Sequence, residues 1–165
     1  NSGCFGMEFK DILLSVQAVD KQGNVLTIPS DKIKFNYRGN DLPKDLIFLS
    51  ASFKGKFKKK NLAKKDMEVL IQKKDESQPT KVKTGGSTFK NPIDQTNEKV
   101  WKLIKSAVPP DSSIGDASIS EKHANFFVNK NNATYNDMIG LIDLVRNKVR
   151  KKTGVNLDLE IVILE

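Results

Sequence analysis

The chain has 165 residues, 38% of them apolar and 29% charged, a composition typical of one globular domain or two small ones. Its formal charge is +8, but only Arg38, Arg146 and Arg150 are arginines. Base reading and bidentate phosphate binding rely on arginine, and no apolar run approaches the length of a bilayer span, so we expect neither a nucleic-acid nor a membrane partner.

The sequence contains one cysteine, Cys4, and one histidine, His123. A single cysteine excludes an internal disulfide and a cysteine-rich zinc site, so we expect a cytoplasmic location and no metal. The first residues carry no basic or long apolar stretch, so we expect no signal peptide. Because the chain begins with Asn1 and at once has the pattern of a strand, we expect a piece of a longer protein.

Residues 11–20 and 25–28 are apolar and rich in β-forming residues, and they flank a polar turn at residues 21–24. This pattern predicts a β-hairpin. A short helical turn is expected next, capped by Ser30.

Residues 45–55 predict a further strand, which is too apolar to be exposed on both faces. Residues 61–76 predict a helix with Asn61 as its cap, because apolar residues recur there at helical spacing. Those residues are Leu62, Met67, Leu70 and Ile71.

Residues 77–87 are polar, with one proline and two glycines, and are the candidate linker. A helix over residues 97–108, a loop at residues 109–118 and a short buried strand at residues 125–129 are expected beyond it. An α+β architecture in two lobes follows, because the elements lack the regular βαβ alternation of a doubly wound fold.

The longest predicted helix begins after Thr134, which lies three residues before Asp137 as in a capping box. Gly154 is placed to end it. Residues 155–164 predict a final strand.

The stretch "VKTGGSTFKNP" at residues 82–92 has two readings. Its glycines allow close approach to a ligand, so Ser87, Lys90 and Asn91 could face an anion; alternatively it is only a structural turn. It is neither a phosphate-binding P-loop nor a nucleophile elbow, because the required residues do not follow in order.

Four other polar residues have two interpretations each. Arg38, in a turn, would clamp a carboxylate or be an ordinary surface residue. His123 and Asn125, at the start of a strand, would serve a site or only hydrogen-bond locally. Glu160 would face solvent or lie buried beside Arg38.

Six motifs taken together resemble the UDP-N-acetylenolpyruvoylglucosamine reductase (MurB) family over nearly the whole chain. They are "NSGCFGMEFKDIL", "FNYRG", "GGSTFKNP", "IGDASISEKHANFFVN", "NATYNDM" and "GVNLDLEI". The resemblance implies the remainder of a PCMH-type FAD-binding lobe at residues 1–80 and a substrate-binding domain at residues 81–154. A C-terminal strand carrying an active-site glutamate follows at residues 155–165.

The resemblance also implies an activity, UDP-N-acetylmuramate dehydrogenase in peptidoglycan precursor synthesis. In that family NADPH reduces FAD, and the flavin reduces the enolpyruvyl group of UDP-N-acetylglucosamine-enolpyruvate. Family members carry further FAD-binding sequence before the part matched here, so we expect a monomeric, truncated form that is inactive alone and does not retain FAD.

Residue roles follow from the family motifs. Ser87 would be the proton donor, Arg38 the partner of the substrate carboxylate and Glu160 the third catalytic group. Lys90, Asn91, His123 and Asn125 would bind the substrate, and Gly3 and Tyr37 the cofactor.

The arginine turn departs from the family pattern Y-R-x-S-x-F, since Asn40 and Leu42 replace the serine and the phenylalanine. This leaves Arg38 in place but puts the finer contacts in doubt. Two alternatives remain at this point: another FAD-dependent oxidoreductase with the same flavin lobe, or a non-enzymatic lysine-rich module that binds polyanions.

Overall fold

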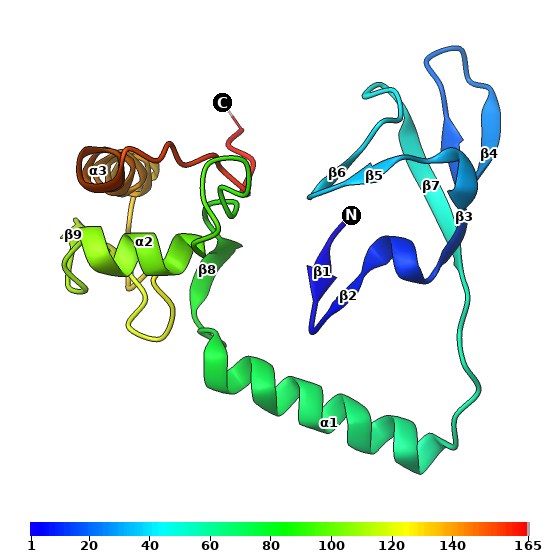
Figure 1. The fold of residues 1–165 in the computed structure, drawn as a ribbon, viewed down its shortest axis with the longest axis horizontal. Helices are drawn as coiled ribbons and strands as arrows, with labels where there is room; N and C mark the ends of the chain where they lie inside the picture. Colours follow the sequence, from blue (N-terminus) through cyan, green and yellow to red (C-terminus); the bar gives the residue numbers. More distant parts are fainter. Residues whose placement is uncertain (165) are drawn as a thin grey trace. The chain divides into compact units, whose positions relative to one another are not determined.

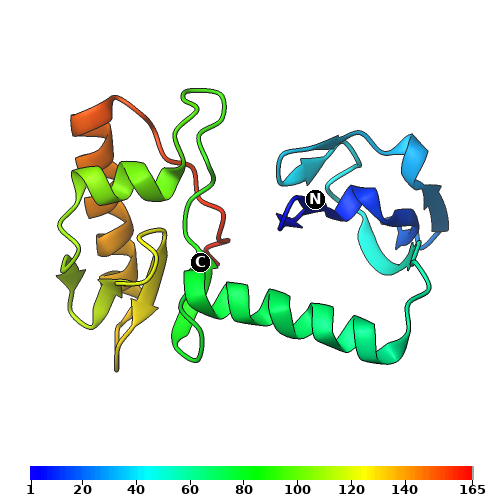
Figure 2. The ribbon, with the colours of Figure 1, turned by 60° about the horizontal axis from the view of Figure 1, so that its bottom comes forward.

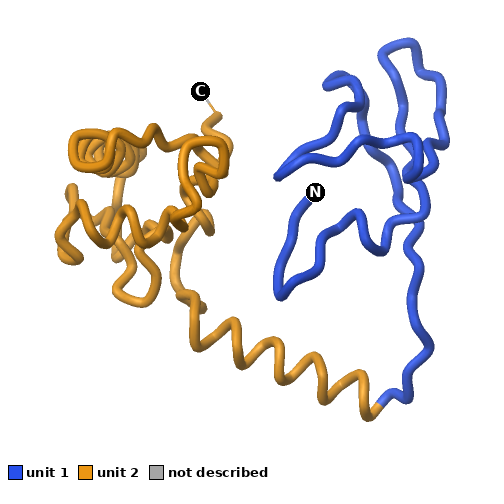
Figure 3. The backbone as a smooth tube through the Cα atoms, in the orientation of Figure 1, with its two compact units in different colours: residues 1–60 blue, residues 61–165 orange. Residues whose placement is uncertain are grey.

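The computed structural model describes residues 1–164 as an α+β protein (Figure 1). Two compact units divide the chain, Asn1–Lys60 and a second that begins at Asn61 (Figure 3). The predicted division at residue 80 therefore falls inside the second unit, because the helix before it is grouped with that unit. Glu165, the last residue of the predicted C-terminal segment, lies outside the described residues.

The first unit contains a three-stranded antiparallel sheet in the order β4-β3-β7. Its strands are β3 (Leu13–Val19), β4 (Val25–Pro29) and β7 (Ile47–Phe53). The predicted hairpin is confirmed as β3 and β4. Asp20 fixes its turn, because one carboxylate oxygen accepts hydrogen bonds from the backbone N–H groups of Gln22 and Asn24, both at 2.9 Å.

Two small hairpins complete this unit, each with a two-residue turn. One joins β1 (Gly3–Cys4) to β2 (Met7–Glu8), and the other joins β5 (Phe35–Asn36) to β6 (Gly39–Asn40). Two 3₁₀ turns follow β2 and β4, η1 (Phe9–Asp11) and η2 (Ser30–Lys32). The expected Ser30 cap is wrong, because Ser30 is the first residue of η2 and Pro29 holds the cap position.

The core of the first unit is small. Only Leu13, Val16 and Ile33 form its buried cluster. All seven residues of β7 are exposed, contrary to the expectation that this strand is covered on at least one face. Strand β7 lies at the edge of the sheet, and no other described element pairs with its outer side.

Helix α1 (Lys60–Ser77) confirms the predicted helix but not its cap or its buried face. Asn61 is the second helical residue, and its side chain accepts a hydrogen bond only from the neighbouring Leu62 N–H, at 3.0 Å. None of the eighteen residues is buried. The apolar spacing was therefore sufficient to predict a helix, but no described element packs on that face.

The second unit is built on a four-stranded antiparallel sheet in the order β8-β11-β10-β9. The strands are β8 (Lys83–Ser87), β9 (Ser113–Ile114), β10 (Ala117–Ile119) and β11 (Phe126–Asn129). The strand predicted at residues 125–129 is confirmed as β11. The linker and the loop were predicted too long, because each contains residues that pair with the central strands β10 and β11.

Two helices pack against this sheet, α2 (Val100–Ala107) and α3 (Tyr135–Thr153), and they contact each other where α2 runs across α3 (Figure 2). The boundaries of α3 are confirmed. Thr134 accepts a hydrogen bond from the Asp137 N–H at 3.1 Å, and the Asp137 carboxylate accepts one from the Thr134 N–H at 2.8 Å. Gly154 ends the helix at φ 75°, a conformation that glycine adopts without steric cost.

The core of the second unit joins the inner faces of both helices to the sheet and to the C-terminal segment. Its fully buried side chains are Phe89, Ile104, Leu141, Ile142, Val145 and Val149. Most of the buried apolar side chains of the described residues therefore lie in this unit. Among the residues described, no helix has the length and apolarity that crossing a bilayer requires.

Candidate active site

Ser87 is the last residue of β8 and pairs with Phe126 of β11. The residue before it, Gly86, has φ +88°, in the region that favours glycine, and the pairing of β8 with β11 shifts register just before the serine. Thr84 Oγ1 donates to the Phe127 carbonyl at 2.7 Å and accepts from the Gly86 N–H at 3.2 Å. These bonds fix the strand immediately before Ser87, whose side chain is half-buried.

The C-terminal segment lies alongside the residues that follow Ser87. Phe89 and Leu159 form an antiparallel bridge. The Lys90 N–H donates to the Asp158 carbonyl at 2.8 Å, and the Glu160 N–H donates to the Thr88 carbonyl at 2.9 Å. The backbone of Glu160 is therefore held next to the residue after Ser87. A single bridge replaces the regular strand predicted over residues 155–164.

Asn125 holds the backbone of the serine segment, by which we mean residues 87–90, through hydrogen bonds to residues 88 and 89. Its side-chain oxygen accepts from the Phe89 N–H at 3.0 Å, and its side-chain nitrogen donates to the Phe89 carbonyl at 2.8 Å. The Asn125 carbonyl also accepts from the Thr88 N–H at 2.8 Å. Because Asn125 is only 2% exposed, its amide is available to the backbone of residues 88–89 and hardly to a ligand.

The two polar residues after Phe89 differ in how they are held. Asn91 accepts a hydrogen bond from the N–H of Val100 at 3.0 Å, so it satisfies the first residue of α2. The backbone of Lys90 is fixed by Asp158, and its side chain is half-buried. Both residues thus lie on rigid backbone within four residues of Ser87.

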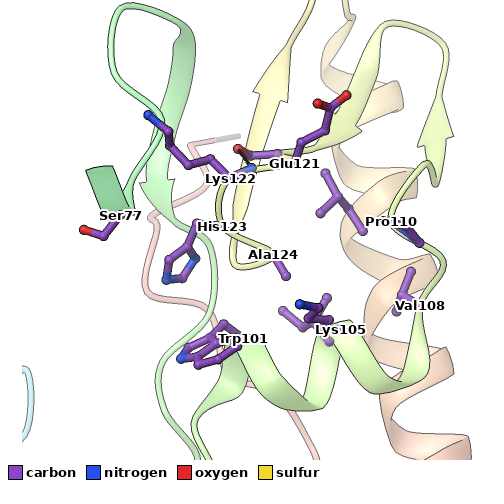
Figure 4. Close-up of a pocket in the computed structure, with 12 residues that line it drawn as sticks. Ser77, Trp101, Lys105, Val108, Pro110, Glu121, Lys122, His123 and Ala124 are labelled. Carbon is purple, nitrogen blue, oxygen red and sulfur yellow. Dashed lines mark hydrogen bonds between the residues drawn. The ribbon is translucent and has the colours of Figure 1, made fainter. Parts of the chain in front are cut away.

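His123 lines a cavity of about 410 Å³ in the second unit (Figure 4). Its ring contacts Phe126 edge-on at a centroid distance of 4.9 Å and faces Trp101 of α2 at 6.4 Å. Burial lowers the pKa of His123 below its ordinary 6.5, and its Nδ1 accepts a hydrogen bond from the Asn125 N–H at 3.2 Å. The imidazole is therefore neutral at physiological pH and acts as an aromatic and hydrogen-bonding wall.

The rest of the cavity combines an apolar floor with charged groups at its edge. Lys105, Lys122 and Glu121 are among its lining residues, and Lys122 donates to the carbonyl of Asp75 in α1. Aromatic rings beside lysine side chains suit a planar, negatively charged ligand such as a nucleotide. Neither Ser87 nor Glu160 lines this cavity, which is consequently a separate subsite from the serine segment.

Arg38 lies in the first unit, in the turn between β5 and β6. It has φ 57°, and such left-handed geometry costs a non-glycine residue about 1–2 kcal/mol. Its guanidinium carbon lies 4.9 Å from the centre of the Tyr37 ring. A Cβ placed on Gly3 would lie 3.7 Å from Arg38 Nη1, so Arg38 lies close to Gly3 as well as to its neighbour Tyr37.

Comparison with known proteins identifies the family. Residues 78–164 match the family model described as UDP-N-acetylenolpyruvoylglucosamine reductase, C-terminal domain. The UDP-N-acetylenolpyruvoylglucosamine reductase of Pelagibacter ubique is 62% identical over all 165 residues, which make up 55% of that protein. The chain belongs to the UDP-N-acetylenolpyruvoylglucosamine reductase (MurB) family.

Other MurB proteins agree with this assignment. The reductase of Rickettsia typhi is 45% identical over 98% of this chain and 54% of its own length. The crystal structure of the MurB protein of Thermus caldophilus matches 97% of this chain and 56% of its own, with a TM-score of 0.79 and 28% identity. The chain thus spans about half the length of the MurB relatives that it matches, and the α+β fold of the MurB C-terminal domain is shown.

Several MurB site residues predicted from sequence fall into one unit. Ser87, Lys90, Asn91, Asn125 and Glu160 all lie on the backbone ladder around Phe89. Arg38, Gly3 and Tyr37 belong to the first unit. The structure adds residues that the motifs did not suggest.

The first of these is Thr88, which is 2% exposed and whose carbonyl accepts from the Glu160 N–H. The second is Trp101, which faces His123 across the cavity. Trp101 is the only tryptophan in the sequence, and that rarity was the one signal that marked it in advance.

Proposed function

We propose that this chain is part of a flavoenzyme that reduces the enolpyruvyl group of UDP-N-acetylglucosamine-enolpyruvate to UDP-N-acetylmuramate, a step of peptidoglycan precursor synthesis. The observation that carries the proposal is the ladder that holds Glu160 beside the residue after Ser87, within the part of the chain that matches the MurB domain. The proposal retains the cytoplasmic location and the monomeric state expected from the sequence.

The first unit fits FAD only in part. Exposed Phe5 and the ring of Tyr37 offer apolar and planar surface of the kind that suits a flavin ring. Gly6 has φ +80°, and no atom lies within 4 Å of the position that a Cβ would take there, so a ligand can approach the backbone. As the family resemblance implied, we infer that this chain alone does not retain FAD.

Bound FAD would supply a hydride to the substrate double bond, having received it from NADPH. This chain supplies the remaining groups. The Ser87 hydroxyl donates a proton to the carbon next to the substrate carboxylate. A serine hydroxyl is a weak acid, so it is effective only against a strongly basic carbon such as this one, and the serine regains its proton from solvent.

Arg38 pairs with the substrate carboxylate and stabilises the negative charge that develops there. Its guanidinium, which stays protonated at any physiological pH, suits this role. Glu160 orients the groups around the serine. We assign Asn125 to positioning the serine segment, because both ends of its buried amide are bonded to Phe89.

The nucleotide part of the substrate is proposed to lie in the cavity between Trp101 and His123. The aromatic rings there provide a surface for the uracil, and Lys105 and Lys122 at the edge of the cavity carry charge of the right sign for the diphosphate. Lys90 and Asn91, between the cavity-lining α2 and Ser87 in sequence, are proposed to contact the sugar.

The test uses the intact flavoenzyme carrying Ser87→Ala. NADPH should reduce the flavin at the wild-type rate, whereas reoxidation by the enolpyruvyl sugar should slow about 10²–10⁴-fold, the usual contribution of a general acid. Ser113→Ala, an exposed serine of β9 in the same unit, is the matched control. Normal reoxidation of the flavin in Ser87→Ala would refute the proton-donor role. If the enolpyruvyl sugar failed to reoxidise the flavin of the wild-type enzyme as well, another FAD-dependent oxidoreductase would be favoured.

A second measurement tests the cofactor inference. The purified 165-residue chain should be incubated with FAD and then separated from free FAD by gel filtration. The protein fraction should show no flavin absorbance. Stoichiometric flavin in that chain would contradict the inference that it does not retain FAD.

A further inference from the structure

The arginine turn of the first unit is held by a network that begins in the β1–β2 hairpin. We propose that Glu8 is a positioning residue for Arg38, which it holds over Gly3, and that Asn1 ties the two hairpins together. The inference rests on the proposed function, in which Arg38 binds the substrate carboxylate.

The turn needs support because its backbone is strained. Arg38 has φ 57°, a conformation that persists in a non-glycine residue only where the surroundings enforce it. On its C-terminal side, a Cβ at Gly39 would lie 2.2 Å from Asn36 Oδ1, so the Asn36 side chain packs closely on Gly39 and would have to move aside for a larger residue. The close packing of Asn36 on Gly39 thus fixes one side of the turn.

Asn1 supports the other side. Its side-chain nitrogen donates to Asn36 O at 3.1 Å and to Glu8 Oε2 at 2.7 Å. Its side-chain oxygen accepts from the Lys10 N–H at 3.2 Å. One amide therefore connects strand β5, which leads into the arginine turn, to strand β2, which carries Glu8.

The side chains of Glu8 and Arg38 both approach Gly3. The position of a Cβ on Gly3 lies 3.2 Å from Glu8 Cγ and 3.7 Å from Arg38 Nη1, so both side chains occupy the space that glycine leaves open. Lys10 binds Glu8 Oε2 at 2.9 Å, which fixes the carboxylate. Hydrogen bonds from Lys10 and Asn1, with a smaller attraction to Arg38, lower the pKa of Glu8, so this group is ionised at neutral pH.

Besides its part in the β1–β2 hairpin, Glu8 is placed to restrict the position of the Arg38 guanidinium. The Tyr37 ring bounds the guanidinium on one side, at 4.9 Å, and the Gly3–Glu8 pair bounds it on another. An arginine side chain loses much rotamer freedom when it is fixed in this way before the substrate arrives, and such preorganisation improves binding of the carboxylate. Loss of the Glu8 charge should therefore affect the enzyme through Arg38.

The experiment is a double-mutant cycle on the intact flavoenzyme, with Glu8→Gln, Arg38→Ala and both together. Glu8→Gln should slow flavin reoxidation by low concentrations of the enolpyruvyl sugar by about tenfold and leave flavin reduction by NADPH unchanged. In the Arg38→Ala background the same change should have almost no further effect. Glu68→Gln, which removes the same charge from exposed α1, is the control and should behave as wild type.

Equal slowing by Glu8→Gln with and without Arg38 would overturn the proposal, since Glu8 would then act independently. If Arg38→Ala itself left reoxidation unchanged, the proposed function of Arg38 would fail, and this outcome is distinguishable because it does not involve Glu8.

A second measurement does not depend on catalysis. The side-chain N–H signal of Arg38 in ¹⁵N NMR spectra should be sharp in the wild type and broadened in Glu8→Gln, while the signal of Arg146 stays the same. An unchanged Arg38 signal in the folded variant would overturn the positioning role.

Discussion

Replacement of Asn125 by alanine tests how the serine segment is held. The substitution removes the two hydrogen bonds, 3.0 and 2.8 Å long, that its side chain makes with the Phe89 backbone. Phe89 is fully buried, so water does not replace the lost partners. A buried polar group left unsatisfied costs about 1–3 kcal/mol, and two such groups give an expected loss of about 2–6 kcal/mol from the free energy of unfolding.

Urea unfolding followed by Trp101 fluorescence measures this loss, because the only tryptophan of the sequence lies in the same unit. The melting temperature should fall by roughly 10 °C or more for a unit of this size. Asn97→Ala, an exposed asparagine ahead of α2, is the control and should change stability by less than about 0.5 kcal/mol. A loss below about 0.5 kcal/mol for Asn125→Ala would refute the reasoning that the Phe89 backbone depends on this amide.

Two further predictions concern the second unit. Burial lowers the pKa of His123 and favours its neutral form, so the unfolded state binds a proton more readily than the folded state near pH 6.5. The free energy of unfolding should therefore be constant well above pH 6.5 and fall as the pH drops through 6.5. A flat profile in the wild type, or an unchanged slope in His123→Gln, would contradict this. Thr134→Ala removes the cap of α3 and should lower the free energy of unfolding in urea by about 1 kcal/mol. Thr80→Ala, outside any helix or strand, is the control. Equal stability of the two variants would show that the Thr134–Asp137 pair does not stabilise the helix.

The sequence predicted those parts of the fold whose causes are local. Helix α3 begins and ends where its capping threonine and its C-terminal glycine require, and both signals lie within a few residues of the boundary. The β3–β4 hairpin likewise follows from a turn whose hydrogen bonds involve only Asp20 and its neighbours.

The predictions that differ from the structure concern residues whose partners lie far away in sequence. Residues 83–87 look like a linker, yet they form β8 because β11, some forty residues later, pairs with them. Asn125 looks like a ligand-binding residue at the start of a strand, yet its amide bonds to Phe89, 36 residues away. Local pattern cannot reveal such partners, and the site residues implied by the family motifs remain predictions.

The exposure of β7 has a consequence for handling the protein. A seven-residue edge strand with Ile47, Phe48, Leu49 and Phe53 all exposed presents both unpaired backbone groups and apolar side chains. Such an edge is a template for pairing with another copy, and its sequence offers no lysine or proline to discourage this. The purified chain should therefore form intermolecular β-structure at high concentration, and a lysine substituted for Leu49 should extend the range over which it remains monodisperse.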